Sequence, residues 1–254
     1  MSGHSKWSNI KYKKGAADAK RGKIFSKLAK EITVAAKDGG GDPSANPHLR
    51  HAMDKAKEVN MPNDNVDRAI KRGTGELPGV SYEQVQYEGY GSAGVAILVE
   101  ALTDNKNRTT SEVRSIFSKR GGNMAGAGSV AWIFIRKGLI VVSKEIVEED
   151  DLLSMVIDAG AEDMKIEEDS YEIIMSVDNF EDIKNKLKEN SIDCLSAGIT
   201  MVPSNAVKLT GQDAKQVLLL MEDLESHDDI QDVYANFDIP DEIIEEVANE
   251  DTGS

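Results

Sequence analysis

The 254-residue chain is poor in cysteine and in long apolar runs, and each shortage excludes a class of protein. Its single cysteine, Cys194, rules out an internal disulfide and a zinc site built from several cysteines. The longest apolar runs, such as residues 95–99 and 130–135, are far shorter than the roughly 20 residues that cross a bilayer. The first thirty residues lack the apolar stretch of a signal peptide. We therefore expect a cytoplasmic protein with no membrane partner.

Aromatic residues are also scarce, at 5% of the chain, so the cores should be built from Ile, Val, Leu and Ala.

The net charge of −15 is spread very unevenly. Residues 1–72 hold 16 Lys and Arg against 8 Asp and Glu, whereas residues 73–254 hold 14 against 37. Electrostatic fields fade over roughly 8–10 Å in physiological salt, so a basic segment can attract a polyanion although the whole chain is acidic. The distribution favours a nucleic-acid partner at the N-terminal end.

A flexible basic arm, residues 1–16, precedes a helical domain that is predicted over residues 17–76. The first helix is expected over 16–37, with an apolar face and a nearly opposite stripe of lysines. A second helix is expected over 46–59, and Pro62 is well placed to begin a third. The stripe on the first helix consists of Lys20, Lys23, Lys27, Lys30 and Lys37.

Residues 137–203 are expected to fold as a unit with the element order βαββαβ, which is the ferredoxin-like pattern. The pieces on either side of it, residues 80–136 and 204–238, give the same order if strands form at 129–135 and 205–209. The predicted fold class is therefore α+β and multidomain. A three-helix domain is followed by two ferredoxin-like α/β domains, the second inserted into the first.

The final residues, 239–254, are rich in acid, and we expect them to be a frayed or disordered tail.

Cations and aromatic side chains gather in the arm and the helical domain. Phosphate backbones attract Lys and Arg and release counterions on binding, and exposed aromatic rings can stack on unpaired bases. A solvated helix face beside a flexible arm is the alternative that this pattern leaves open. The predicted nucleic-acid-binding residues are Lys6, Trp7, Lys11, Lys13, Lys14, Lys20, Arg21, Lys23, Lys27, Lys30, Arg68, Lys71 and Arg72.

A second polar segment, residues 103–109, joins an expected strand to a helix expected over 109–120, with Thr109 and Glu112 spaced as a capping box. The N-terminus of a helix beside an arginine can bind an anion, so Asn105, Arg108 and Thr109 form a candidate anion site. A purely local role in the turn and the helix cap is equally compatible with these residue types.

Three patterns that suggest catalysis or metal binding fail on spacing or context. Residues 15–23 lack the glycine spacing and the Ser or Thr of a phosphate-binding loop. His48 and His51 have too few potential partner ligands for a metal site. The glycine-rich stretch 121–128 follows a helix and enters a strand, the reverse of a dinucleotide-binding turn. We expect no enzymatic activity, no small-molecule substrate, no cofactor and no metal.

Motifs along nearly the whole chain resemble those of the YebC/PmpR family. They are GHSKW at 3–7, NIK at 9–11, DAKRGK at 18–23 with Phe25 and KL at 27–28, NMP at 60–62, AIKRGTGE at 69–76, YEGYG at 87–91, TDN at 103–105, NRT at 107–109, GG at 121–122, and GSV at 128–130 with Trp132. The resemblance implies a helical N-terminal domain and two α/β domains, the third inserted into the second. The sequence departs from the pattern at 90–94, where YGSAG stands in place of YGPGG, and at Met124, where leucine is common.

The resemblance also implies a probable transcriptional regulator that binds DNA. Some relatives are linked to translation instead, as mitochondrial activators or as factors that help ribosomes through proline-rich stretches. Carried over by position, the family's nucleic-acid-contacting region would include Lys6, Trp7, Lys11, Lys20, Arg21 and Lys23, extended by Arg68, Lys71 and Arg72.

Two binding functions therefore stay open, a DNA-binding transcriptional regulator and an RNA- or ribosome-associated translation factor. The lysine-rich first helix lacks the Asn, Gln and Arg pattern of base-edge contacts, and its stripe fits structured or unpaired RNA at least as well as DNA. A third possibility, from a different class, is an acidic scaffold that acts through the two α/β domains.

Overall fold

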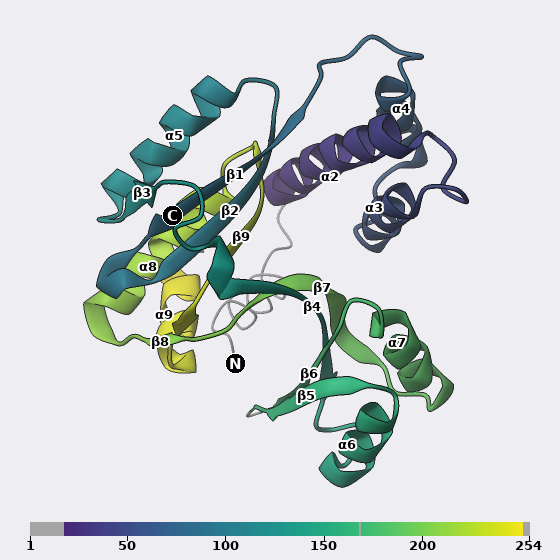
Figure 1. Cartoon of the computed structure of the whole chain (residues 1–254), viewed down its shortest axis with the longest axis vertical. Coiled ribbons are helices and arrows are strands. Elements are labelled where there is room, and N and C mark those ends of the chain that lie inside the picture. Colours follow the sequence, from purple (N-terminus) through teal and green to yellow (C-terminus); the bar gives the residue numbers. More distant parts are fainter. Residues whose placement is uncertain (1–17, 168, 251–254) are drawn as a thin grey trace.

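The structure of the chain is a computed structural model that describes residues 18–167 and 169–250. Figure 1 shows three parts, a helical domain, an outer sheet domain and an inserted sheet domain. The helical domain contains α2 (Asp18–Gly39), α3 (Pro47–Glu58) and α4 (Asn63–Gly73). Its core is aliphatic, with Ile32, Leu49 and Ala56 fully buried. Within the described ranges, no helix is both long and apolar enough to span a membrane.

Asn46 fixes the angle between the first two helices. Its side-chain oxygen accepts a hydrogen bond from the backbone N–H of Leu49 at 3.1 Å and so caps α3. Its amide nitrogen donates to the carbonyl oxygens of Ala35 and Gly40, both at 2.8 Å, and so ties α3 to the end of α2. Because this side chain is buried, all of these bonds are made inside the protein, where an unmade bond would be costly.

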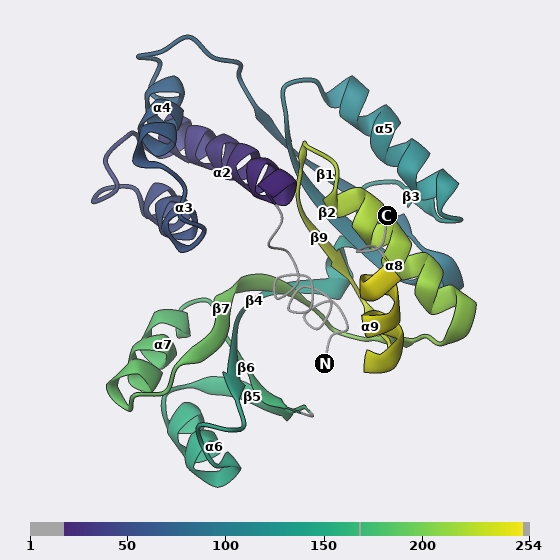
Figure 2. The same ribbon diagram turned by 180° about the vertical axis from the view of Figure 1, so that it is seen from behind.

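The outer sheet is antiparallel and has the strand order β3-β1-β2-β9. Two helices cover one of its faces, as Figures 1 and 2 show from opposite sides, and Phe117 and Val217 lie in the core between the layers. On the other face, Val130, Ile133 and Phe134 pack against the sheet. The elements are β1 (Glu83–Tyr90), β2 (Ala96–Thr103), α5 (Lys106–Lys119), β3 (Asn123–Ala125), α8 (Gly211–Glu225) and β9 (Ile230–Ala235).

Two strands expected in the outer sheet are not there. The run 129–135 instead contains a 3₁₀ turn, η2 (Ala131–Ile133), because Val130 and Ile133 are three residues apart and bury against the same surface. The expected strand at 205–209 shrinks to β8 (Val207–Lys208), which pairs in parallel with β10 (Phe237–Asp238) outside the main sheet. Strand β1 takes the place between β2 and β3, because it forms a tight hairpin with β2 across the short 3₁₀ turn η1 (Ser92–Gly94).

The inserted domain has the expected βαββαβ order, with the strands arranged β5-β6-β4-β7. Helices α6 and α7 pack on one face of this sheet around Ile140, Ile173 and Ile183. The predicted fold class, a helical domain followed by two α/β domains with one inserted, is confirmed. The elements are β4 (Phe134–Ser143), α6 (Glu149–Asp158), β5 (Ala161–Ile166), β6 (Ser170–Met175), α7 (Phe180–Glu189) and β7 (Cys194–Pro203).

The expectation of a disordered acidic tail is wrong for residues 241–250. These residues form α9 (Asp241–Glu250), which packs against α8 with Ile244 and Val247 buried. Lys215 of α8 also pairs with Glu246 at 2.6 Å. The apolar residues recur at helical spacing between the acids, so one face of an acidic helix is buried while the other is solvated.

We predict that Ile244→Ala destabilises the outer domain by about 2–5 kcal/mol, because it leaves a cavity beneath α9. The matched control is Glu242→Ala in the exposed part of the same helix, which should stay within about 0.5 kcal/mol of the parent protein. Urea denaturation followed by circular dichroism measures both. Equal stability of the two variants would show that α9 adds nothing to the fold.

Candidate nucleic-acid interface

Part of the predicted binding set falls where the structure gives no description. Lys6, Trp7, Lys11, Lys13 and Lys14 lie outside the described residues, and Lys20 is placed only as part of the backbone of α2. Their contact with nucleic acid stays a prediction.

Three lysines of the α2 stripe lie against the end of α8. Lys23 Nζ donates to the carbonyl oxygen of Ser226 at 3.1 Å, and Lys27 Nζ donates to that of Glu225 at 2.7 Å. Lys30 Nζ reaches the carbonyl oxygen of Asp228 at 3.0 Å. The last carbonyl groups of a helix lack partners within the helix and carry partial negative charge, so cations stabilise this end. In Figures 1 and 2 the start of α2 lies beside the connection between α8 and β9.

Asp229, just before β9, is the centre of the contact between the helical domain and the outer sheet. Its Oδ1 accepts from Lys30 Nζ at 2.6 Å, and its Oδ2 accepts from Arg108 Nη2 at 2.6 Å. The hydroxyl groups of Thr109 and Thr103 donate to Oδ2 at 2.7 and 3.2 Å. Only 7% of the Asp229 side chain and 14% of the Lys30 side chain are exposed, so these charges are largely removed from solvent.

Burial alone would raise the pKa of the Asp229 carboxyl group. The hydrogen bonds from Lys30, Arg108 and Thr109, together with the charge of Lys30, outweigh burial and hold this pKa well below its usual range. The carboxylate is therefore the form that the fold stabilises. For Lys30, contact with a nucleic-acid phosphate would require breaking this pair.

The candidate anion site at the start of α5 is already occupied by a group of the same chain. Asn105 caps the helix by accepting from the backbone N–H of Arg108 at 3.1 Å, while Arg108 and Thr109 hold the carboxylate of Asp229. These residues do bind an anion, but it is intramolecular. The predicted capping box was wrong, because α5 begins three residues earlier, at Lys106, and Thr109 lies inside the helix.

Exposed cations lie along α4. Val66 and Ala69 face the core of the helical domain, which turns Arg68, Lys71 and Arg72 outward, as the sequence predicted. Arg68 Nη2 donates to the Asn65 side-chain oxygen at 2.8 Å, and these three residues make no ion pair with the described part of the chain. The remaining member of the predicted set, Arg21 on α2, is also exposed and has interactions of its own.

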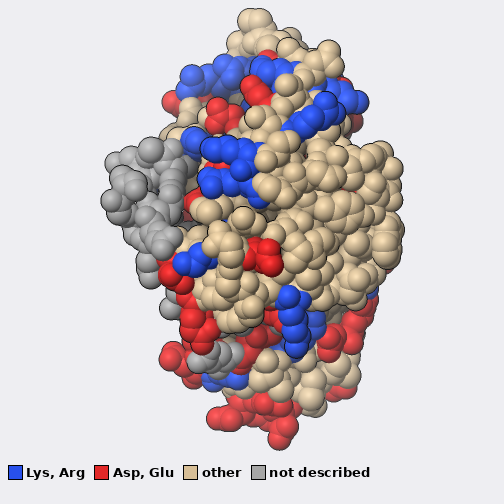
Figure 3. All heavy atoms as spheres, turned by 90° about the vertical axis from the view of Figure 1, so that its left-hand side faces the viewer, with Lys and Arg blue, Asp and Glu red and all other residues tan. Residues whose placement is uncertain are grey.

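The charges also separate across the surface. In Figure 3, Lys and Arg gather in the upper part of the face shown, and Asp and Glu dominate the lower part, where the inserted domain lies. A polyanion approaching this face would therefore be attracted toward its upper part and repelled from the inserted domain.

A feature that the sequence did not reveal is the loop before β4. The carboxylate of Glu88, a residue only 5% exposed, accepts from the backbone N–H groups of Gly128 and Val130, both at 2.6 Å, and of Ala131 at 2.8 Å. Burial alone would raise the pKa of Glu88, but these backbone hydrogen bonds lower it. The loop presents Trp132, which is 70% exposed. The expected strand at 129–135 concealed this arrangement.

Glu112, His227 and Asp229 are the one group of potential metal ligands found among the described residues, with ligand atoms within 4.8 Å of one another. Both oxygens of Asp229 already accept hydrogen bonds from Lys30 and Arg108, so two positive charges stand where a metal ion would bind. This cluster is therefore better explained as part of the domain contact.

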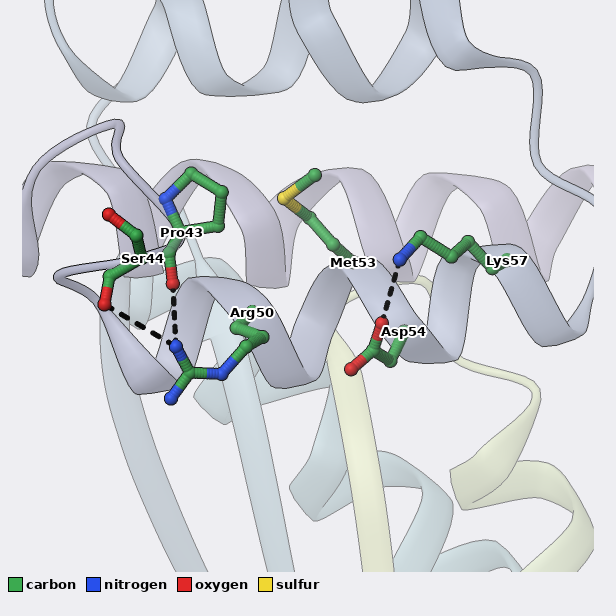
Figure 4. A pocket seen from close by; sticks show the side chains of 6 residues that line it. All are labelled: Pro43, Ser44, Arg50, Met53, Asp54 and Lys57. Carbon is green, nitrogen blue, oxygen red and sulfur yellow. Dashed lines mark hydrogen bonds and ion pairs between the residues drawn. The ribbon is translucent and has the colours of Figure 1, made fainter.

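A hollow of about 270 Å³ on the outer side of α3 has no reactive group free for chemistry. Figure 4 shows Arg50 reaching the carbonyl oxygens of Pro43 and Ser44, and Asp54 paired with Lys57 at 2.9 Å. The polar groups of the wall thus bind one another.

Comparison with known proteins places this architecture among named relatives. The family described as "TACO1/YebC protein N-terminal domain" matches residues 5–76, and the family described as "TACO1/YebC second and third domain" matches residues 82–237. The chain is 57% identical to a "Probable transcriptional regulatory protein" of Dictyoglomus turgidum, over 98% of this chain and 100% of the relative. It is 58% identical to a protein of the same description from Geobacter sulfurreducens, over 97% and 100%.

A solved structure is also similar, that of a conserved hypothetical protein from Aquifex aeolicus. The two chains are 46% identical, with a TM-score of 0.78 over 89% of this chain and 93% of that one.

The Asp229 contact gives a test by mutation. Asp229→Asn leaves Lys30 without its counter-charge and Arg108 with only the more exposed Asp104 and Glu112, and we expect a loss of more than about 1.5 kcal/mol, since the bonds involve charged groups. The loss should stay below the roughly 3–5 kcal/mol of a fully buried pair, because 44% of Arg108 is exposed. Asp228→Asn, at the exposed neighbouring position, is the matched control and should be nearly neutral.

The same pair of variants has a defined pH dependence. Because the pKa of Asp229 is lowered by folding, its stabilising effect is complete above the unfolded-state pKa of about 4 and is lost as the pH falls toward the folded-state pKa. The stability difference between the parent protein and Asp229→Asn should therefore be constant from about pH 8 to pH 5 and shrink in more acidic solution. Urea denaturation at pH 7, 5 and 4 measures it. A difference that grew on acidification would contradict the assignment.

Proposed function

The chain belongs to the TACO1/YebC family, and we propose that it is a non-catalytic regulator of gene expression that binds nucleic acid through its helical domain, as a DNA-binding transcriptional regulator. The observation that carries the proposal is the exposed row Arg68, Lys71 and Arg72 on α4. The names of the relatives from Dictyoglomus turgidum and Geobacter sulfurreducens support the regulatory part. The acidic inserted domain would then keep the polyanion on one side of the molecule.

Helix α4 has the residue types that DNA recognition needs. Arg68 and Arg72 lie four residues apart, one turn along the helix, on its exposed side. Arginine is the commonest reader of guanine in the major groove, and Lys71 supplies a contact to the phosphate backbone. The lysines of α2 contribute differently. Lys23 is held by a carbonyl group, which leaves the lysine charge in place, whereas the charge of Lys30 is balanced by Asp229.

An RNA- or ribosome-associated translation factor is the second candidate. The exposed indole of Trp132 favours it, because aromatic rings that project from a protein stack on unpaired bases, which are commoner in RNA than in duplex DNA. Sedimentation of lysate through sucrose separates the two candidates. Comigration with ribosomes that survives DNase and is lost in high salt favours translation, and its absence favours DNA.

We predict that the double variant Lys71→Gln/Arg72→Gln binds duplex DNA more weakly than the parent protein. Each lost phosphate contact should also lower the steepness of the salt dependence by roughly one unit in a plot of log K against log salt concentration. The matched control is Lys186→Gln/Lys188→Gln, which removes two exposed lysines from α7 of the inserted domain. Fluorescence anisotropy of a labelled oligonucleotide at several salt concentrations measures both. If the two variants bind alike, α4 is not the binding surface.

A further inference from the structure

Trp132 is held with its indole ring in solvent. Its exposure of 70% is the largest among the exposed apolar side chains of the described residues. Tryptophan is usually well buried, because its ring has a large apolar surface. The one polar atom of the ring is already satisfied, since Nε1 donates to the carbonyl oxygen of Ser129 at 3.0 Å. What the ring offers to solvent is therefore apolar and aromatic.

The loop that carries Trp132 is fixed from below. A buried carboxylate costs free energy unless its oxygens accept hydrogen bonds. The carboxylate of Glu88 accepts three, from the backbone N–H groups of Gly128, Val130 and Ala131. The Tyr90 hydroxyl adds a fourth tie by donating to the carbonyl oxygen of Ser129 at 3.1 Å. A side chain on such a loop is pre-organised, so a ligand that binds it loses less conformational freedom. Val130 and Ile133 are buried and anchor the loop, and the indole of Trp132 projects from it.

The surface of the loop next to Trp132 is open backbone. A Cβ atom added at Gly126 or at Gly128 would meet nothing within 4 Å. Glycine is favoured at position 128 because the backbone there has a φ of +85°, which residues with a Cβ atom rarely adopt. Neither the backbone angle nor crowding requires glycine at position 126. The missing side chains allow another molecule to approach the backbone of the loop closely. Arg136, exposed at the start of β4, adds positive charge nearby along the chain, part of which is balanced by Glu100.

We propose that Trp132 is a stacking platform for an unpaired nucleobase, at the junction of the outer sheet and the inserted domain. The inference rests on the proposed nucleic-acid binding and adds to it a second contact point, outside the helical domain. A π-face stacks on every base, so the site takes single-stranded nucleic acid with little sequence preference. Glu88 acts as a positioning residue through the loop, without touching the base.

Quenching of the indole fluorescence tests this contact directly. The sequence has two tryptophans, so Trp7→Phe is introduced into the full chain to leave Trp132 as the only reporter, and all comparisons are made within that background. A single-stranded oligoribonucleotide, the matching single-stranded oligodeoxyribonucleotide and the DNA duplex are titrated in turn. We expect quenching by single strands and little by the duplex, whose bases are already stacked. The two single strands show whether the site distinguishes RNA from DNA.

Affinity measured by anisotropy gives the second readout. Trp132→Ala should weaken single-strand binding roughly tenfold, and Trp132→Phe should restore most of it. Gly126→Glu should also weaken it, because the new carboxylate repels phosphate while open space accommodates the side chain. Leu195→Ala, which removes another exposed apolar side chain from strand β7, is the matched control and should bind as before.

The outcomes separate this inference from the proposal on which it rests. If Lys71→Gln/Arg72→Gln weakens binding but Trp132→Ala does not, and the indole is not quenched, the platform is wrong and the binding function stands. If no nucleic acid binds the parent protein at all, both fall. Quenching by single strands together with the loss in Trp132→Ala and its recovery in Trp132→Phe supports the platform.

Discussion

The carboxylate of Asp229 is the interaction on which the arrangement of the helical domain and the outer sheet depends. It joins Lys30 of α2, Arg108 of α5 and the turn before β9, three segments far apart in the sequence. A charge this well buried is stable only with partners that are themselves positioned, so the first helix cannot shift along the outer domain without removing Lys30 from the carboxylate. Lys23 and Lys27 extend the same contact by donating hydrogen bonds to backbone carbonyl groups at the end of α8.

This contact divides the basic residues into two groups with different physical roles. Lys30 balances a carboxylate and contributes little net field beyond it, whereas Lys23 donates to a backbone carbonyl group, which leaves its charge in place. The cations on α4 have no such partner among the described residues and face solvent. Charge density along the sequence cannot distinguish these cases, because an intramolecular carboxylate and a nucleic-acid phosphate attract the same lysine.

The sequence predicted those features that depend on periodicity. The three helices, the outward direction of Arg68 and the βαββαβ order of the inserted domain all follow from the spacing of apolar residues. The predictions from the sequence failed where contacts between distant segments determine the local structure. Val130 and Ile133 pack against the outer sheet, and the segment expected to be a strand forms a 3₁₀ turn instead. Ile244 packs on α8, and the segment expected to be a disordered acidic tail forms a helix. Asp229, whose carboxylate is the anion bound at the candidate anion site, is about 120 residues from Arg108 in the sequence, and no local sequence pattern connects the two residues.

Glu88, within β1, and Asp229, in the turn before β9, each lie at a junction of the outer sheet with another part of the chain. Asp229 holds the helical domain at one, and Glu88 holds the loop that leads into the inserted domain at the other. Each is a buried carboxylate whose bonds lower its pKa, so both junctions are built around charges that are costly to leave unpaired. The separation between α4 and Trp132 is then set by the fold, and a nucleic acid that touches both must match that separation. Loosening either carboxylate would change that separation without removing any group that we propose to contact the nucleic acid.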